Sequence, residues 1–401
     1  MRSQSLFEGD RLTMDDSIAL TVDALNAYRE RYRHWAIAYS GGKDSSALVT
    51  LVKRLIEVGR VRAPETLTVL YADTRMELPP LQTCAVTVLA ELERRGARAQ
   101  VVLPTLDDRF FVYMLGRGVP PPKNRFRWCT AQLKIEPMVA ALKSLREEAG
   151  EKLLMLTGVR LGESAARDQR IVTSCSRDGA ECGQGWFQES TPEAVADTLA
   201  PLLHWRVCHV WDWLMFDHLE HGFPTLPVAE TYGLDEEGSQ AENGARTGCV
   251  GCNLASRDTA LDTLLKNPRW TYLAPFKRLK PLYAELTLPH SRLRKGGNER
   301  RKDGTLSKNQ MRMGPLTLEA RRLGLDVVLG IQGEINAAAI INDRPQVSLV
   351  NEEEHGRILE LIEARTFPNK WDGTEVTGDV MLDEMFADGT VQPLMSEMFG
   401  A

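Results

Sequence analysis

The chain has 401 residues, of which 43% are hydrophobic and 26% charged, and its formal net charge is -6 at pH 7. This composition is typical of a globular protein with a sizeable core and argues against a protein that is basic overall, although it allows a local basic patch. No apolar run approaches the ~20 residues of a membrane span. The polar N-terminus is unlike a signal peptide. We therefore expect a cytoplasmic protein without a membrane partner.

Predicted helices and strands alternate along the first 160 residues. Helical spacing of apolar residues predicts helices at 15–33, 46–60, 80–96 and 131–149. Apolar and β-branched runs predict strands at 34–39, 66–74, 99–104 and 152–160. Strands that alternate with helices favour an α/β fold, a parallel twisted sheet flanked by helices.

The periodicity weakens after residue 170. Cysteines, glycines and tryptophans indicate a loop-rich insertion to about residue 255, helices are expected at 256–286, and residues 291–308 are basic and polar. A helical C-terminal part follows. We therefore expect three segments: an α/β domain at 1–170, a cysteine-rich and helical region at 171–290, and a basic loop with a helical region at 291–401.

The stretch SGGKDSS, residues 40–46, stands between the first predicted strand and the next helix. Gly41 and Gly42 allow the backbone to approach a ligand closely, and the N–H groups of a helix N-terminus favour an anion. Lys43 can neutralise phosphate, and Asp44 can cap the helix or help to position a metal. The hydroxyls that can donate hydrogen bonds are those of Ser40, Ser45 and Ser46. The spacing is neither the Walker loop nor GxGxxG, and an ordinary tight turn is the alternative.

SGGKDS resembles the pyrophosphate loop of the N-type ATP pyrophosphatases, the adenine nucleotide α-hydrolase superfamily, over residues 30–170. The superfamily includes adenylylsulfate and phosphoadenylylsulfate reductases, tRNA thiolases and ATP sulfurylase small subunits. The resemblance implies ATP and Mg²⁺ at the carboxyl ends of the strands. In YADTRMELP it implies that Asp73, Thr74 and Glu77 face the nucleotide. In GVRLGESAARDQR it implies a phosphate-binding element made of Gly158, Arg160, Glu163, Ser164 and Arg167.

Seven cysteines are present, and two of them, Cys249 and Cys252, form the CxxC of TGCVGC. CxxC alone fits zinc, an iron–sulfur cluster or a redox dithiol. Cys129, in RFRWCT, resembles a [4Fe–4S] ligand of adenylylsulfate reductases, which have two adjacent cysteines where this chain has one. We expect the fourth ligand to be Cys182, with Cys175 as the rival. Two further cysteines, Cys84 and Cys208, are expected in the core.

Longer motifs resemble the sulfurtransferase-like component of bacterial DNA phosphorothioation over residues 30–370. They are NRFRWCT, LAPLLHWRVCHVWDWL, RTGCVGCNLASRDTALD and SKNQMRMGPLTLEARR. The resemblance implies an ATP pyrophosphatase that adenylylates a DNA backbone phosphate so that sulfur can replace oxygen. It implies DNA, a cysteine desulfurase and other phosphorothioation proteins as partners, and it allows a homodimer. Lys43 and Arg160 would be the electrophilic groups, and Asp44 and Asp73 metal or positioning carboxylates.

Three other functions compete with this one. A tRNA thiolase uses the same loop, and a nucleotide-binding iron–sulfur scaffold would show little turnover. Sulfonucleotide reduction is disfavoured, because the ECG at 181–183 lies in mid-chain and no cysteine follows Cys252.

Residues 291–308 contain seven Lys or Arg and two acids, which suits either DNA phosphates or a solvated loop. Arg312, Arg321 and Arg322 are expected near the same surface.

Overall fold

The computed structural model divides the chain into two compact units. It describes residues 12–162, 169, 186–188, 195–232, 248–296, 300, 303–305, 311–380, 384–385 and 390–392. The first unit comprises Met1–Asp73, Glu77–Leu103 and Ile135–Thr247, and the second Thr74–Met76, Pro104–Lys134 and Gly248–Ala401. These are not the three consecutive segments expected from the sequence. The second unit is discontinuous, because residues 104–134 pack with the C-terminal helices.

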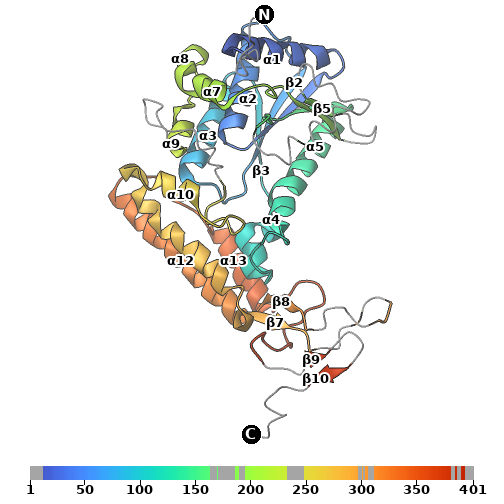
Figure 1. Ribbon diagram of the computed structural model, residues 1–401, viewed down its shortest axis with the longest axis vertical. Coiled ribbons are helices and arrows are strands. Elements are labelled where there is room, and N and C mark those ends of the chain that lie inside the picture. The colour runs from blue at the N-terminus through green and yellow to red at the C-terminus, as the bar shows by residue number, and fades with distance from the viewer. Residues whose placement is uncertain are drawn as a thin grey trace, which may run out of the picture. The chain divides into compact units, whose positions relative to one another are not determined.

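The first unit is an α/β domain, as predicted (Figure 1). Its strands are β1 (His34–Tyr39), β2 (Thr66–Ala72), β3 (Arg98–Val102), β4 (Leu153–Leu156), β5 (Trp186–Gln188) and β6 (Ala196–Ala200). Its helices are α1 (Met14–Arg29), α2 (Lys43–Glu57), α3 (Pro79–Arg94), α5 (Glu136–Ala149), α7 (Val207–Trp211), η4 (Asp212–Phe216), α8 (His218–His221) and α9 (Leu226–Thr231). All four predicted strands are confirmed, and β1 has the predicted bounds.

The sheet has the order β3-β2-β1-β4-β6-β5, in which five strands are parallel and only β5 is antiparallel to its neighbour. Strand β6 was missed by the sequence analysis, which placed its residues in a loop-rich insertion. The strand is short, and its Asp197 is fully buried and paired with Lys152 at 2.8 Å, so its sequence lacks a continuous apolar run. The order reverses between β1 and β4, where ligands bind in open parallel sheets.

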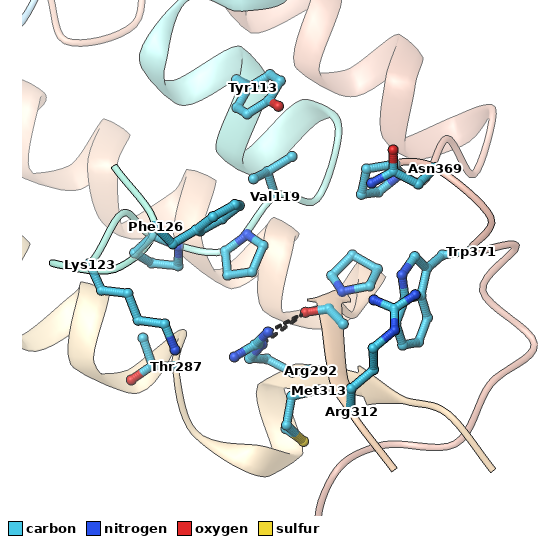
Figure 2. Close-up of a pocket in the computed structure, with 15 residues that line it drawn as sticks. Tyr113, Val119, Lys123, Phe126, Thr287, Arg292, Arg312, Met313, Asn369 and Trp371 are labelled. Carbon is cyan, nitrogen blue, oxygen red and sulfur yellow. Dashed lines mark hydrogen bonds between the residues drawn. The ribbon is translucent and has the colours of Figure 1, made fainter. Parts of the chain in front are cut away.

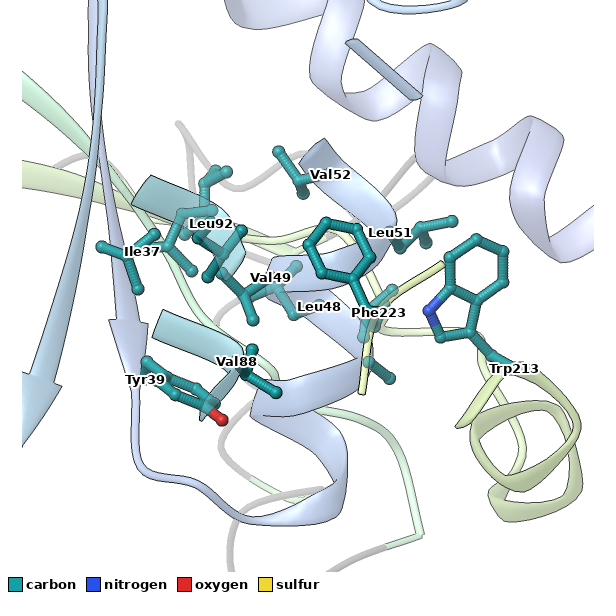
Figure 3. Packing of buried hydrophobic residues seen from close by; sticks show 14 of the residues in the cluster. Ile37, Tyr39, Leu48, Val49, Leu51, Val52, Val88, Leu92, Trp213 and Phe223 are labelled. Atoms are coloured by element: carbon teal, nitrogen blue, oxygen red, sulfur yellow. The ribbon is translucent and has the colours of Figure 1, made fainter. Parts of the chain in front are cut away.

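Alternate side chains of β1 enter two cores. Trp35, Ile37 and Tyr39 join a large cluster with residues of α1, α2 and α3 and of the segment 199–229. Figure 3 shows Ile37 and Tyr39 beside Val49 and Val88, with Trp213 and Phe223 on the same side of the sheet. Ala36 faces the other way and packs with Leu142 and Leu145 of α5. Burial on both faces fixes the register of β1, and therefore the position of the loop that follows it.

The second unit is mostly helical, as predicted for the C-terminal part. Its helical elements are η1 (Leu106–Asp108), η2 (Val112–Gly116), α4 (Trp128–Thr130), α10 (Thr259–Leu264), η5 (Pro268–Arg278), α11 (Leu279–Glu285), η6 (Pro289–Ser291), α12 (Leu318–Ile341) and α13 (Glu352–Glu363), and η3 (Ala131–Ile135) leads into α5. The strands β7 (Arg292–Arg294) and β8 (Met313–Leu316) form one antiparallel ribbon, and β9 (Glu384–Met385) and β10 (Val391–Gln392) another.

Helix α12 is the one helix in the described part of the chain that is long and apolar enough to cross a membrane. A core helix passes the same test, and α12 packs against η2 and η5. Its Arg321 is fully buried and donates to the carbonyls of Leu115, Gly116 and Thr366. Burial lowers the pKa of Arg321 to about 10. Arg321 therefore stabilises this unit, and its expected place on a DNA-binding surface was wrong.

Candidate active site

The loop between β1 and α2 has the geometry of an anion site. Gly41 has φ +74°, a conformation that suits glycine. Gly42 is the N-cap of α2 and makes no side-chain capping hydrogen bond, so the N-cap residue itself does not cover the helix N-terminus. Because the first-turn N–H groups of a helix lack partners within the helix, this end of α2 can receive negative charge.

The three serines of the loop have different positions. Ser45 Oγ donates to Gly42 O at 3.0 Å and lies 3.1 Å from Ser40 Oγ, so these two hydroxyls brace the loop. Ser40 is exposed and remains available to a ligand. Ser46 is fully buried, and its hydroxyl lies 3.5 Å from Tyr39 Oη and from Gly41 O. This burial argues against the expected contact between Ser46 and a nucleotide.

Lys43, Asp44 and Arg160 form one ion cluster at the start of α2. Lys43 Nζ lies 2.9 Å from one oxygen of Asp44, and Arg160 Nε lies 2.6 Å from the other. Burial raises the pKa of the Asp44 carboxyl, but Arg160 and Lys43 outweigh burial and hold it below its usual value. Since both oxygens hold cations, Asp44 positions Lys43 and Arg160 here and is not placed as a metal ligand.

Arg160 reaches this cluster because β4 lies next to β1. Ile37 pairs with Leu156, so the segments after the two strands emerge side by side. Arg160 is 5% exposed, and its Nη1 donates to Trp205 O at 3.1 Å. Gly158 packs on the backbone of α2, and a Cβ there would lie 2.9 Å from the carbonyl carbon and oxygen of Asp44. The structure therefore brings together residues predicted from two separate motifs: Lys43 and Asp44 from SGGKDSS, and Arg160 from GVRLGESAARDQR.

The carboxylate predicted after β2 lies at the same edge of the sheet. Tyr39 pairs with Tyr71, and Asp73 follows two residues later, with its N–H donating to Val102 O at 3.1 Å. Burial raises the pKa of the Tyr71 hydroxyl, and the nearby Glu77 and Asp73 raise it further. Asp73 is 8% exposed and Thr74 is fully buried. Three residues of the predicted phosphate element, Glu163, Ser164 and Arg167, lie outside the described residues.

Tyr232 contacts the loop and was missed by the sequence analysis. Its hydroxyl accepts a hydrogen bond from the Lys43 N–H at 3.3 Å, and Lys43 Nζ lies 5.3 Å from the centre of its ring. The hydroxyl thus takes a position at the N-terminus of α2 that an anion would take. Tyr232 is 189 residues from Lys43 in sequence and belongs to no recognisable motif, so only the fold reveals it.

The second unit contains three of the predicted cluster cysteines. Cys129 stands in α4, and Cys249 and Cys252 lie in a turn closed by a hydrogen bond from Cys252 N to Cys249 O at 3.1 Å. Burial raises the pKa of the Cys129 thiol, and the proximity of Cys252 raises it further. Within the described part of the chain, no three His, Cys, Asp or Glu side chains are grouped to hold a single metal ion. Cys175 and Cys182 lie outside that part.

One observation favours a sulfur-rich group at these thiols. Tyr283 is fully buried, and its hydroxyl has no hydrogen-bond partner among the described residues. Burial raises the pKa of this hydroxyl, as do the neighbouring Cys249 and Cys252. A buried hydroxyl without an acceptor is costly, and a thiolate or cluster sulfur would provide an acceptor.

The two cysteines predicted to lie in the core differ. Cys84 is buried on α3 as expected, whereas Cys208 is exposed, so its predicted core position was wrong.

Comparison with known proteins finds one similar family. Residues 34–221, slightly less than half of the chain, match the family model of the phosphoadenosine phosphosulfate reductase domain. Over this segment the chain is therefore similar to that domain. The five parallel strands flanked by helices agree with it. None of the curated proteins compared with the chain matches it.

Solved structures show only distant likeness. A phosphoadenylyl-sulfate reductase from Candida auris, in a phosphate complex, has 13% identity and a TM-score of 0.32, over 53% of this chain and 89% of its own. An FMN adenylyltransferase from Candida glabrata, with FMN and an ATP analogue, has 15% identity and a TM-score of 0.32, over 54% of this chain and 62% of its own. A U34-tRNA thiolase from Methanococcus maripaludis, with its [4Fe–4S] cluster, has 14% identity and a TM-score of 0.31, over 69% of this chain and 82% of its own. TM-scores this low carry no argument about the site.

Proposed function

We propose that this protein is an ATP pyrophosphatase of DNA phosphorothioation, which adenylylates a DNA backbone phosphate so that sulfur can be inserted. The observation that supports it best is the cluster at the start of α2, where Lys43 and Arg160 flank Asp44. Two cations and one carboxylate leave a net charge of +1 beside a helix N-terminus. That combination suits the β and γ phosphates of ATP, which leave together as pyrophosphate.

The chain's own residues would act by position and charge. Asp44 holds Lys43 and Arg160 before ATP arrives, so that little reorganisation is needed as negative charge develops on the leaving group. The Lys43 N–H becomes available to a phosphate oxygen when Tyr232 moves from it. Mg²⁺ would enter bound to the phosphates of ATP. Asp73, at the same edge of the sheet, is a better candidate than Asp44 to bind this ion.

The chemistry proceeds in two displacements. A non-bridging oxygen of the DNA phosphate attacks the α-phosphorus of ATP, and the bond to the β-phosphate oxygen breaks, which releases pyrophosphate. Sulfur at the oxidation level of sulfide then attacks the activated DNA phosphorus. AMP leaves with the original DNA oxygen, and a phosphorothioate remains. Activation is needed because an unmodified phosphate oxygen is a poor leaving group. The sulfur source would be a cysteine desulfurase, whose persulfide would be reduced by two thiols to give sulfide and a disulfide, and other phosphorothioation proteins would complete the reaction in the cytoplasm.

The proposal includes a [4Fe–4S] cluster in the second unit. Cys129, Cys249 and Cys252 would hold it with a fourth cysteine, Cys182 or Cys175, outside the described residues. A four-iron cluster spreads its ligands more widely than a single ion does, so the absence of a one-ion site in the described residues disfavours zinc more than it disfavours the cluster. When bound, the cluster would supply iron and sulfide that can carry sulfur, and Tyr283 would donate to one of its sulfurs.

Iodine cleavage of host DNA tests the substrate, because iodine breaks phosphorothioate linkages. Cells that express the intact system should give cleaved DNA, and cells with Lys43→Ala should give intact DNA. Lys53→Ala is the matched control, since Lys53 lies on the same helix and pairs with Glu57 at 3.6 Å, away from the loop. Uncleaved DNA from the intact system, together with thiolated tRNA that depends on Lys43, would replace DNA by tRNA as the substrate.

A further inference from the structure

The second unit contains a cavity that takes no part in the site described above. Its volume is about 410 Å³, and its lining comes from residues 113–126, from the ribbon β7–β8 with Thr287, and from residues 368–371. Figure 2 shows Lys123, Arg292 and Arg312 reaching toward one space from three places in the chain. The cavity has the size of a site for a small molecule or one monomer unit of a polymer.

The lining is positively charged. Lys123, Arg292 and Arg312 line the cavity, and no Asp or Glu does among the described residues. Arg292 is half-buried, and its Nε and Nη2 both donate to Gly314 O, at 2.9 and 2.6 Å. No carboxylate in the described part of the chain pairs with Arg292, and burial lowers its pKa. A half-buried cation with no carboxylate partner among the described residues favours an anionic ligand.

Aromatic rings also line the cavity. Phe126 lines the cavity and is 44% exposed, so its ring is accessible to a ligand. Figure 2 shows Phe126 and Tyr113 across the cavity from Arg312. Trp371 packs against Gly314, where a Cβ would lie 2.2 Å from the indole, and the Arg312 guanidinium lies 5.0 Å from the Trp371 ring centre. Aromatic faces beside arginines are the usual surroundings of unpaired bases.

The cavity also lies where the basic loop begins and ends. Strands β7 and β8 carry this loop, and the segment from Arg292 to Arg312 contains eight Lys or Arg and two acids. Arg292 and Arg312, the first and last basic residues of this segment, both line the cavity, so a polyanion bound there is attached to a strongly basic stretch of the sequence. Because the cavity is too small for stacked base pairs, it suits one nucleotide of an unpaired strand or one turned out of a duplex.

We infer that this cavity binds one unpaired nucleotide of a DNA strand, with the base against Phe126 and the adjoining phosphates on Arg292, Arg312 and Lys123. The choice of DNA rests on the proposed function, whereas the binding itself needs neither ATP nor its cleavage. The Asn369 amide, which also lines the cavity, can read the edge of the base. Such a site would give the bound strand a base preference at one position.

Anisotropy of a labelled 12-nucleotide single strand, measured without ATP, tests the inference. Phe126→Ala should weaken binding about fivefold or more, as expected for loss of one stacked base. Arg312→Gln should weaken it and reduce the slope of log K against log salt by about 0.7. The matched controls are Phe216→Ala, which removes a ring that is 60% exposed, and Arg269→Gln, which removes a guanidinium 5.2 Å from the Trp270 ring centre. Neither control residue lines the cavity.

Several results would overturn the inference. One is that Phe126→Ala and Arg312→Gln, with unfolding midpoints like that of the wild type, weaken binding no more than their controls do. A second is that a free deoxynucleoside monophosphate binds as tightly as the strand, and a third is that an RNA 12-mer displaces the DNA. Failure of the wild type to bind the strand would reject the cavity as a nucleotide site, while pyrophosphate release from ATP would still test the proposed function separately.

Discussion

Replacement of Gly158 by alanine tests how the loop is positioned. The new methyl would lie 2.9 Å from the Asp44 carbonyl carbon and oxygen and 3.1 Å from Ser45 N, and all three are backbone atoms with little freedom to move. Ordinary contact begins near 3.4 Å, so the segment after β4 must move by about 0.5 Å. Overpacking of this kind costs about 1–3 kcal/mol of stability.

The same movement should reduce catalysis. The Arg160–Asp44 contact is 2.6 Å long, and Arg160 is two residues from the substitution. Since a misplacement of about 1 Å costs on the order of 10²-fold in rate, we expect Gly158→Ala to slow pyrophosphate release roughly tenfold. Gly330→Ala is the matched control, because a Cβ at Gly330 in α12 meets nothing within 4 Å, and alanine favours a helix by up to ~1 kcal/mol.

Urea unfolding and pyrophosphate release from ATP, measured on both variants, test whether Gly158 positions the loop. Gly330→Ala should equal the wild type in rate and equal or exceed it in stability. If Gly158→Ala releases pyrophosphate within twofold of the wild type and unfolds at the same urea concentration, the segment after β4 does not position the loop through this contact, and the reasoning is refuted.

Three other predictions follow from the same geometry. Tyr232→Phe removes the acceptor of the Lys43 N–H, so ATP should bind about 2- to 10-fold tighter in calorimetry; weaker binding would show that Tyr232 assists the phosphate instead. Asp44→Asn leaves Lys43 and Arg160 without their counterion and should lower the free energy of unfolding by up to about 3 kcal/mol at pH 7. Because the pKa of Asp44 is lowered in the folded protein, its contribution is present above about pH 3.8 and lost as pH falls through the folded pKa, so wild type and variant should converge in acid; a constant difference across pH would contradict this. Anaerobically purified protein should absorb broadly near ~400 nm, and Cys249→Ser should abolish the band; a colourless wild type with stoichiometric zinc would refute the cluster.

Local sequence patterns predicted much of the first unit. β1 is a continuous apolar run buried on both faces, so its bounds were predictable, and Gly41 marks a turn whose positive φ suits glycine. Arg321 lies on the same face of α12 as the buried Leu325 and Val328, but the sequence does not show that the carbonyls of Leu115, Gly116 and Thr366 would satisfy a buried guanidinium. Tyr232 and the split of the second unit depend on contacts between segments far apart in sequence, which periodicity does not encode.

The identity of the products made from ATP tests the central claim most directly. Purified protein incubated with ATP, Mg²⁺ and unmodified DNA should form AMP and pyrophosphate in amounts that depend on Lys43, with Lys53→Ala behaving as the wild type. ADP and inorganic phosphate as the only products, or pyrophosphate release that Lys43→Ala leaves unchanged, would contradict the assignment of this loop to the β and γ phosphates.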